Sequence, residues 1–433
     1  MIRMRMPHAD LLIMHRFRRR PKPELNPPAG SGHADEPMIE QHSYPPGRVT
    51  SGGRSCGDDG PGSADAVASS RAGAPAENLP QVTYSKSRGF VGLLARLDCA
   101  IAVSSYQSRL LYHLGRNAGG GLHVHQCVLP AAMGISYRPD GQLTLATNNQ
   151  IVRFENILKP GQKINNTFDA CFLPRRIHLT GGLAIHDVGV GDDGRVFFVN
   201  TSFNCLATTS DRHSFVPVWR PPFIDALVNE DRCHLNGLAM RDGRPAYVTA
   251  VSRSNTIDGW RDRRDGGGVV IDVATDRIVC EGLSMPHSPR WHDGQLWLLN
   301  SGTGEMGVVA GLGSGAGRFE PRAFCPGFLR GLAFHKGHAF VGLSKPRHQR
   351  FEGLPLDARL AAADSEAWCG LQVIDLASGA CAEWFRIDGD VTELYDVEVL
   401  PGIANPMALS PTGGDWATLI TWEDGPEHLD AIA

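Results

Sequence analysis

The chain has 433 residues, of which 42 % are hydrophobic and 20 % charged, enough to build one large core or two ordinary ones. Its 42 Lys and Arg against 46 Asp and Glu leave a formal net charge of -4, which argues against nucleic acid as a partner. No run approaches the roughly 18 consecutive apolar residues of a membrane-spanning helix, so we expect no membrane partner either.

Ten cysteines are scattered along the chain without a single Cys-x-x-Cys pair, which argues against a zinc site or a disulfide framework. Most stand in apolar runs, as Cys99 does in DCAI and Cys325 in FCP. Free Cys is among the most buried residue types, and thiols persist in reducing compartments. We therefore predict buried free thiols and a cytoplasmic protein.

Residues 1–85 differ in composition from everything that follows. Six arginines lie between Arg3 and Arg20, and sequence rich in Pro, Gly, Ser and Ala follows with few apolar residues. Such a segment cannot bury enough surface to offset its ordering entropy, so we predict a disordered low-complexity tail. Binding of an acidic partner and a transit-like role are the alternatives. Residues 411–433 are predicted to form a C-terminal tail.

From about residue 90 the sequence consists of short β-rich runs cut by turns, roughly every 8–12 residues. A unit of one apolar strand, a turn ending in Gly and a second apolar strand recurs with a period near 50, which is typical of β-propeller blades. In one copy, HDV leads through Asp193-Gly194 into VFFVN. The opening residues of the six copies are Met133, His186, Asn236, His287, Arg330 and Asp396.

The two ends of this repeating region complement each other. Little strand-like sequence follows the sixth copy, whereas three strand-like runs precede the first, at residues 100–103, 109–112 and 122–125. A blade built from both ends would close the ring and leave no free edge. We therefore predict an all-β fold, a six-bladed β-propeller over residues 86–410. Seven blades are the alternative, because residues 344–368 could conceal one, although we interpret them as an insertion loop.

The first strand of each blade lines the central channel of a propeller, so the six opening residues should form a ring around the axis. Burying polar groups together there costs free energy unless they are hydrogen-bonded, and water in the channel is the simplest partner for them. Two imidazoles, an amide and a carboxylate also suit a divalent metal ion. We predict that its ligands are His186, Asn236, His287 and Asp396.

Two further residues complete the predicted site. His234 lies two residues before Asn236, so strand alternation places it on the same side, where it would act as acid or base. Arg330 would bind an anionic substrate, since guanidinium matches a carboxylate bidentately. The aromatic stretch HSFVPVWRPPF, residues 213–223, is predicted to pack between blades, with a lid over the channel as the alternative.

The segments CHLNGLAM and DGRPAYVT, residues 233–249, resemble the Asn-Gly-Leu strand of gluconolactonase and regucalcin-type six-bladed propellers. That resemblance implies one divalent ion on the axis, with Asn236 and Asp396 as ligands, whereas His186 and His287 depart from the pattern and the glutamate ligand of that family has no counterpart here. Over residues 90–410 the chain is more closely similar to an uncharacterised bacterial propeller family, through GLAIHDVGV, EDRCHLNGLA and ELYDVEVLPG. This second resemblance implies the fold and no activity.

Two functions of different class follow from these patterns. The first is a metal-dependent enzyme, a lactonase-like hydrolase or a lyase, that acts on a small molecule or peptide in the axial channel. The second is a non-catalytic propeller whose loops bind a protein partner.

Overall fold

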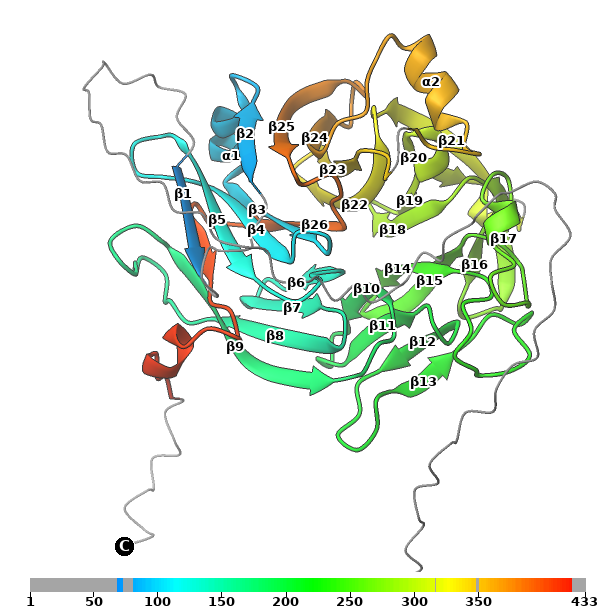
Figure 1. Ribbon diagram of the computed structural model, residues 1–433, viewed down its shortest axis with the longest axis horizontal. Coiled ribbons are helices and arrows are strands. Elements are labelled where there is room, and N and C mark those ends of the chain that lie inside the picture. Colours follow the sequence, from blue (N-terminus) through cyan, green and yellow to red (C-terminus); the bar gives the residue numbers. More distant parts are fainter. Residues whose placement is uncertain (1–67, 73–80, 316, 348–349, 423–433) are drawn as a thin grey trace, which may run out of the picture. The chain divides into compact units, whose positions relative to one another are not determined.

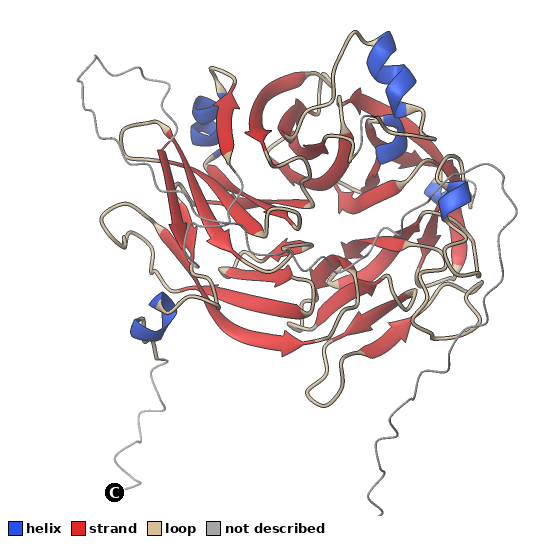
Figure 2. Ribbon diagram, in the orientation of Figure 1, coloured by secondary structure: helices blue, strands red, loops and turns tan. Residues whose placement is uncertain are grey.

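The structure, a computed structural model, describes residues 68–72, 81–315, 317–347 and 350–422. These residues form six β-sheets of four or five strands, which surround one axis as blades (Figure 1). Strands make up most of the fold, and the few helices lie in the connections (Figure 2). The prediction of a six-bladed β-propeller is confirmed.

Blades 2, 3 and 4 each consist of four consecutive antiparallel strands, ordered from the axis outward as along the chain. Blade 2 comprises β10 (Ile185–Val190), β11 (Val196–Asn200), β12 (Cys205–Thr208) and β13 (Val216–Trp219). Blade 3 comprises β14 (Leu235–Arg241), β15 (Arg244–Ala250), β16 (Gly268–Asp272) and β17 (Arg277–Leu283). Blade 4 comprises β18 (Pro286–His292), β19 (Gln295–Asn300), β20 (Glu305–Ala310) and β21 (Arg318–Phe324).

Blades 1, 5 and 6 carry a fifth, outermost strand from a distant part of the chain. Blade 1 comprises β6 (Ile135–Tyr137), β7 (Gln142–Ala146), β8 (Gln150–Asn156), β9 (Ala170–Leu179) and the added β27 (Pro406–Ala408). Blade 5 comprises β22 (Phe328–His335), β23 (His338–Ser344), β24 (Gly370–Asp375), β25 (Cys381–Gly389) and the added β2 (Val82–Lys86). Blade 6 comprises β26 (Asp396–Pro401), β3 (Cys99–Ser105), β4 (Leu110–Arg116), β5 (Leu122–Val128) and the added β1 (Ala68–Ala72).

Blade 6 closes the ring as predicted. Its innermost strand, β26, comes from the C-terminal end of the repeats and pairs antiparallel with β3, so that Asp396 faces Ser104 and Val399 faces Ile101. The ladder covers the inner edge of β3 and joins the two ends of the propeller in one sheet.

The strands are apolar on both faces because each blade lies between two others. Six hydrophobic clusters fill the six interfaces, and the one between blades 5 and 6 also buries α1 (Phe90–Leu97) through Phe90 and Leu94. In β3 all seven residues are buried. This explains the continuous apolar runs in the sequence, where a sheet with one solvated face would alternate.

Residues 344–368 form an insertion within blade 5, not a seventh blade. They connect β23 to β24 and contain α2 (Leu356–Ala362), whose Leu356 and Leu360 are buried beside Phe351. The other helices among the described residues are single 3-10 turns: η2 (Arg261–Arg263), η3 (Ser301–Thr303), η4 (Leu312–Ser314) and η5 (Asp415–Thr418).

The structure starts the propeller earlier than residue 86. Strands β1 and β2, which lie inside the predicted tail, extend the outer edges of blades 6 and 5, β1 parallel to β5 and β2 antiparallel to β25. A short strand with little apolar sequence gains order from pairing with an existing edge, which composition does not reveal. The rest of the predicted tail lies outside the described residues. Beyond residue 410, Leu419 packs beside Leu173 of blade 1.

Nine of the ten cysteines are described, and all nine have free thiols, eight of them buried; only Cys381 is exposed, while Cys56 lies outside the described residues. Burial raises the pKa of Cys99 and Cys205 to about 12, so these thiols stay protonated. In the part of the chain that the structure describes, no helix is long and apolar enough to cross a membrane. Of the predicted packing stretch 213–223, Trp219 and Phe223 pack against the hydrophobic residues between blades 2 and 3, whereas Val216–Trp219 form β13, the outermost strand of blade 2.

Candidate functional site

The innermost strands of all six blades begin at the same end of the axis and place equivalent residues in layers. The first layer consists of Met133, His186, Asn236, His287, Arg330 and Tyr395. The second layer, one residue further along, consists of Gly134, Asp187, Gly237, Ser288, Gly331 and Asp396. Glycine therefore alternates with a hydrogen-bonding residue around the second layer.

Each hydrogen-bonding residue of the second layer joins its blade to the next one. Asp187 accepts the backbone N–H of Leu238 at 2.9 Å, and Asp396 accepts that of Ile135 at 2.9 Å. The hydroxyl of Ser288 accepts the N–H of Gly331 at 3.0 Å. These bonds satisfy backbone donors that face the axis and would otherwise be unpaired.

Arg290, on β18 in blade 4, holds the second layer together. Its Nη1 donates to Asp187 at 2.8 Å, and its Nη2 donates to Asp396 at 3.2 Å. Nε donates to the carbonyl of Leu332 at 3.1 Å, and Nη1 also donates to that of Leu238 at 3.2 Å. One guanidinium thus bonds to blades 2, 3, 5 and 6.

Asp396 therefore does not stand in the ring of the other predicted residues. Its carboxylate belongs to the second layer, and Tyr395 occupies the first-layer position of blade 6: the ring of Tyr395 lies 5.7 Å from that of His186 and 5.0 Å from the Arg330 guanidinium. The first-layer residue of the sixth repeat is thus Tyr395, one residue before the predicted Asp396. In a strand, a shift of one residue turns a side chain to a different level and face.

His186 and His287 are held by the same arrangement in blades 2 and 4. The Nδ1 of His186 lies 2.9 Å from the carbonyl oxygen of Ala184, and that of His287 lies 2.8 Å from the oxygen of Met285. Ala184 and Met285 both have left-handed backbone conformations, with φ of 47° and 49°. Because a carbonyl oxygen only accepts, Nδ1 carries the proton in both rings, which leaves Nε2 as a lone pair.

His234 occupies the same left-handed position in blade 3, with φ of 50°. Asp231 fixes it twice, by accepting the backbone N–H at 3.0 Å and by lying 2.6 Å from Nδ1. The ring stacks on Trp260 with centroids 4.1 Å apart and lies 4.8 Å from the ring of His186. An Asp–His pair of this kind leaves Nε2 as the atom that exchanges a proton.

Arg330 lies between two aromatic rings, 5.6 Å from the centroid of Phe328 and 5.0 Å from that of Tyr395. Among the described residues no carboxylate lies within ion-pair distance of it, and its Nε is buried without a hydrogen-bond partner. The Glu393 carboxylate, whose pKa Arg330 helps to lower, is already bonded to Arg347 at 2.7 Å and to Tyr106 at 2.9 Å. The guanidinium is therefore available to an external anion.

We define the axial polar cluster as His186, His234, His287, Arg330 and Tyr395. Among the described residues, the Nε2 of His287 and the hydroxyl oxygen of Tyr395 are also buried without partners. Burial lowers the pKa of His186 and His287 well below 6.5, and the charges of Arg330 and His234 lower both further. Burial raises the pKa of Tyr395, so its hydroxyl remains a donor. At neutral pH the cluster therefore combines the Arg330 cation, the neutral imidazoles of His186 and His287, and the phenol of Tyr395.

The donor set does not fit the divalent ion that the sequence predicts. Asn236 accepts the hydroxyl of Thr249 at 2.6 Å through Oδ1, and Asp396 is bonded to Arg290 and to two backbone N–H groups. Of the four predicted ligands only His186 and His287 keep a free ligand atom, and Arg330 places a positive charge near both. No three His, Cys, Asp or Glu side chains in the described ranges are grouped to hold a metal ion.

Glu398, two residues beyond Asp396 on β26, makes the stability of the fold depend on pH. Burial raises its pKa to about 7 from the usual 4.5, Arg290 opposes the rise, and Asp396 adds to it. The folded protein thus binds more protons than the unfolded chain between about pH 4.5 and 7, so this residue's contribution to stability is lost as pH rises through that window.

Between pH 5 and pH 8 the parent should lose unfolding free energy that Glu398→Gln does not lose. We expect the difference in unfolding free energy between variant and parent to shift by about 1–3 kcal/mol in favour of the variant over this range. Urea unfolding at both pH values measures it, with Glu366→Gln, at an exposed position, as the control. Equal pH dependence in parent and Glu398→Gln would show that Glu398 is ionised at no cost in the fold.

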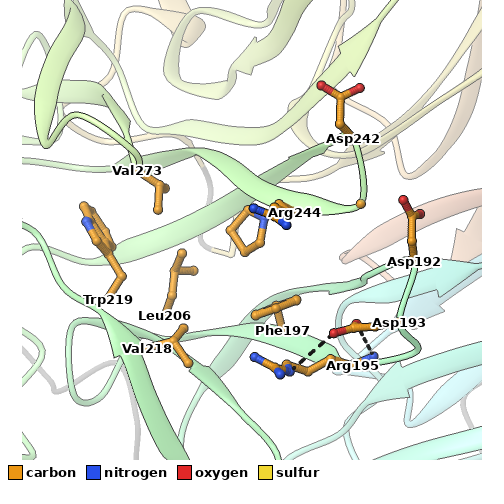
Figure 3. A pocket seen from close by; sticks show the side chains of 12 residues that line it. Asp192, Asp193, Arg195, Phe197, Leu206, Val218, Trp219, Asp242, Arg244 and Val273 are labelled. Carbon is orange, nitrogen blue, oxygen red and sulfur yellow. Dashed lines mark hydrogen bonds and ion pairs between the residues drawn. The ribbon is translucent and has the colours of Figure 1, made fainter.

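A separate cavity of about 580 Å³ lies between blades 2 and 3, away from the axial polar cluster (Figure 3). Phe197, Leu206, Val218 and Trp219 line one part of it, and the turn residue Asp192 lies at another. Its charges are largely paired within the chain, as in the contact of 3.7 Å between Arg195 and Asp193. None of the predicted site residues lies there.

Sequence reasoning missed Asp231, Trp260 and Tyr395. A signal for Tyr395 was present, because LYDVEV aligns with IHDVGV and pairs Tyr395 with His186. Asp231 stands in the charged run EDR beside His234, whose pairing depends on a left-handed backbone turn. Trp260 comes from a long connection in blade 3, and no periodicity places it.

Comparisons with known proteins find similar solved structures and one family. No curated protein matches the chain. Similar solved structures include a nidogen/laminin complex (11 % identity, 70 % of this chain and 99 % of that one, TM-score 0.43). A virginiamycin B lyase from Staphylococcus aureus matches at 10 % identity over 71 % and 99 % of the two chains, with a TM-score of 0.34. A putative gluconolactonase matches at 12 % identity over 60 % and 89 %, with a TM-score of 0.36.

A family described as a domain of unknown function matches residues 88–409, which spans all four-stranded parts of the six blades. This confirms the resemblance to an uncharacterised propeller family that the sequence segments carried. The chain belongs to the DUF4915 family.

Proposed function

We propose that the chain is an enzyme that binds a small anionic molecule at the axial polar cluster and transfers a proton through His234. The observation that carries the proposal is the Asp231–His234 pair, with its 2.6 Å contact, beside the half-buried Arg330 that has no carboxylate partner among the described residues.

Each side chain of the site has a role in the proposed reaction that follows from its chemistry. Arg330 binds a carboxylate or phosphate of the substrate through its free N–H groups, and the rings of Phe328 and Tyr395 hold its plane in place. Asp231 keeps the proton of His234 on Nδ1 and stabilises the imidazolium that forms when Nε2 takes a proton. The Tyr395 hydroxyl donates a hydrogen bond to oxygen where negative charge develops.

Hydrolysis and elimination are both within reach of this set, because each needs a base to remove a proton from water or carbon and a donor to stabilise the resulting anion. This keeps the hydrolase or lyase of the sequence prediction and assigns its acid–base and anion-binding steps to His234 and Arg330. A non-catalytic propeller with a protein partner remains the alternative, and it requires nothing of His234.

The test is a screen of small carboxylates and organic phosphates for turnover by the full chain, followed by kinetics of variants. For any substrate found, we expect His234→Asn, which keeps a residue tolerant of left-handed backbone, to lower kcat by about 10²–10⁴ and to abolish the pH dependence of the base. Arg330→Met should raise KM or lower kcat/KM, whereas the exposed Arg318→Met should change neither. Unaltered kinetics in both site variants would overturn the proposal.

A further inference from the structure

The three imidazoles of the axial polar cluster all have the same tautomer. In His186, His234 and His287 the Nδ1 atom faces an oxygen that only accepts: a backbone carbonyl in two cases and the Asp231 carboxylate in the third. Each ring therefore presents a lone pair at Nε2, and no Nε2 is hydrogen-bonded to another described residue.

Hydroxyl groups that directly follow the second strand of each blade, Thr201 after β11 and Ser301 after β19, reinforce two of these tautomers. Thr201 lies 2.8 Å from Nδ1 of His186 and donates its proton to the carbonyl of Leu235 at 2.6 Å. Ser301 lies 3.1 Å from Nδ1 of His287 and donates to the carbonyl of Leu329 at 2.7 Å. Because each hydroxyl proton is already used, its oxygen can only accept from the imidazole, which keeps the proton on Nδ1.

A ligand that satisfies these rings has to supply hydrogen-bond donors. The Nε2 of His287 is buried, and a buried acceptor without a partner costs free energy comparable to a lost hydrogen bond. A plain carboxylate would satisfy Arg330 and leave the imidazoles unpaired. Complementarity therefore requires an anionic group together with O–H or N–H groups on the same small molecule.

The charge on Arg330 decides between the two kinds of donor. Its guanidinium lies 5.0 Å from the ring of Tyr395, which lies 5.7 Å from that of His186, so a second cation bound at these rings would stand close to the first. The lowered pKa of His186 and His287, caused mainly by burial and in smaller part by Arg330, agrees with this. An ammonium group would meet the same repulsion, and a neutral hydroxyl would not. A hydroxyl group also resembles the water that would occupy the free site more closely than an ammonium group does.

We infer that the substrate is a monoanion that carries at least two hydroxyl groups, with its anionic group on Arg330 and its hydroxyls on the Nε2 atoms of His186 and His287. This inference rests on the proposed function and names its substrate class. Thr201 and Ser301 are positioning residues, since they act through the imidazoles that they orient.

The test compares three four-carbon carboxylates that differ only in substituents: butyrate, 2-aminobutyrate and 2,3,4-trihydroxybutanoate, the last in each stereoisomer. Calorimetric titration of the full chain is expected to show binding of one trihydroxy isomer at least about tenfold tighter than butyrate or the amino acid. Thr201→Val with Ser301→Ala, which keep the shape of each side chain closely, should reduce this preference and leave dependence on Arg330 intact.

The outcomes separate the two proposals. Equal binding of butyrate and every trihydroxy isomer, lost in Arg330→Met, would overturn the hydroxyl inference and leave the anion site standing. Binding that is the same in the parent and Arg330→Met, or absent for all three compounds in both, would overturn the anion site as well. Preference for 2-aminobutyrate would show that the repulsion from Arg330 does not decide the donor.

Discussion

Replacing Arg290 by methionine is expected to lower the free energy of unfolding by about 3–5 kcal/mol, because it leaves the carboxylates of Asp187 and Asp396 buried without their cation. Both carboxylates are only 4 % exposed as side chains, so water cannot replace the guanidinium. The loss also removes donors to the carbonyls of Leu238 and Leu332. The effect should be felt in every blade, because Asp396 continues the contact to Ile135 of blade 1.

Urea unfolding followed by tryptophan fluorescence measures the change, with Arg318→Met as the matched control. Arg318 loses the same charge but is 81 % exposed and pairs with Glu320 at the surface, where ion pairs contribute little. A loss below about 1 kcal/mol in Arg290→Met would mean that the two carboxylates are protonated or hydrated in the fold, and that Arg290 does not hold the ring.

Gly331→Ala is the second change for which we expect a large loss, about 3 kcal/mol or more. Gly331 has a φ of 83°, and an added Cβ would lie 2.5 Å from the backbone nitrogen of Val397 and 2.7 Å from the carbonyl carbon of Asp396. These are backbone atoms of the closing strand, so they cannot rotate away as a side chain would. The clash adds to the strain of a left-handed alanine.

Gly337→Ala separates the two contributions, because Gly337 has a φ of 74° and an added Cβ would meet nothing within 4 Å. It should lose only about 1 kcal/mol, the backbone part. Thermal or urea unfolding of the two variants compares them directly. A similar loss of unfolding free energy in both variants would show that β22 and β26 can move apart at no cost. That result would contradict the close packing of the second layer.

The number of blades and the closure could be predicted from the sequence because each blade is a local unit. A strand, a tight turn with Gly and a second strand are encoded within about 15 residues, so the repeat appears without knowledge of long-range pairing. The fifth strands β1, β2 and β27 could not be predicted, since each is short and is ordered by a distant edge.

For the candidate site, the positions of the residues could likewise be predicted from the repeat, and their roles could not. The positions of His186, Asn236, His287 and Arg330 follow from the repeat and agree with the first layer of the structure. Their roles do not follow from it, because Thr249 donates a hydrogen bond to the oxygen of Asn236, and Arg290 pairs with Asp396. Such pairing depends on side chains from other strands and blades, and the spacing of residues along one strand gives no information about them.

The closing blade also sets an order of events during synthesis. Strands β3, β4 and β5 leave the ribosome early, and their innermost partner, β26, is translated about 290 residues after β3. At roughly 5–20 residues per second this is a delay of about 15–60 s. Throughout that interval the inner edge of β3, with all seven residues destined for burial, lacks its partner strand. The nascent chain therefore presents an aggregation-prone edge for most of its synthesis, and this is where a holding chaperone would have to act.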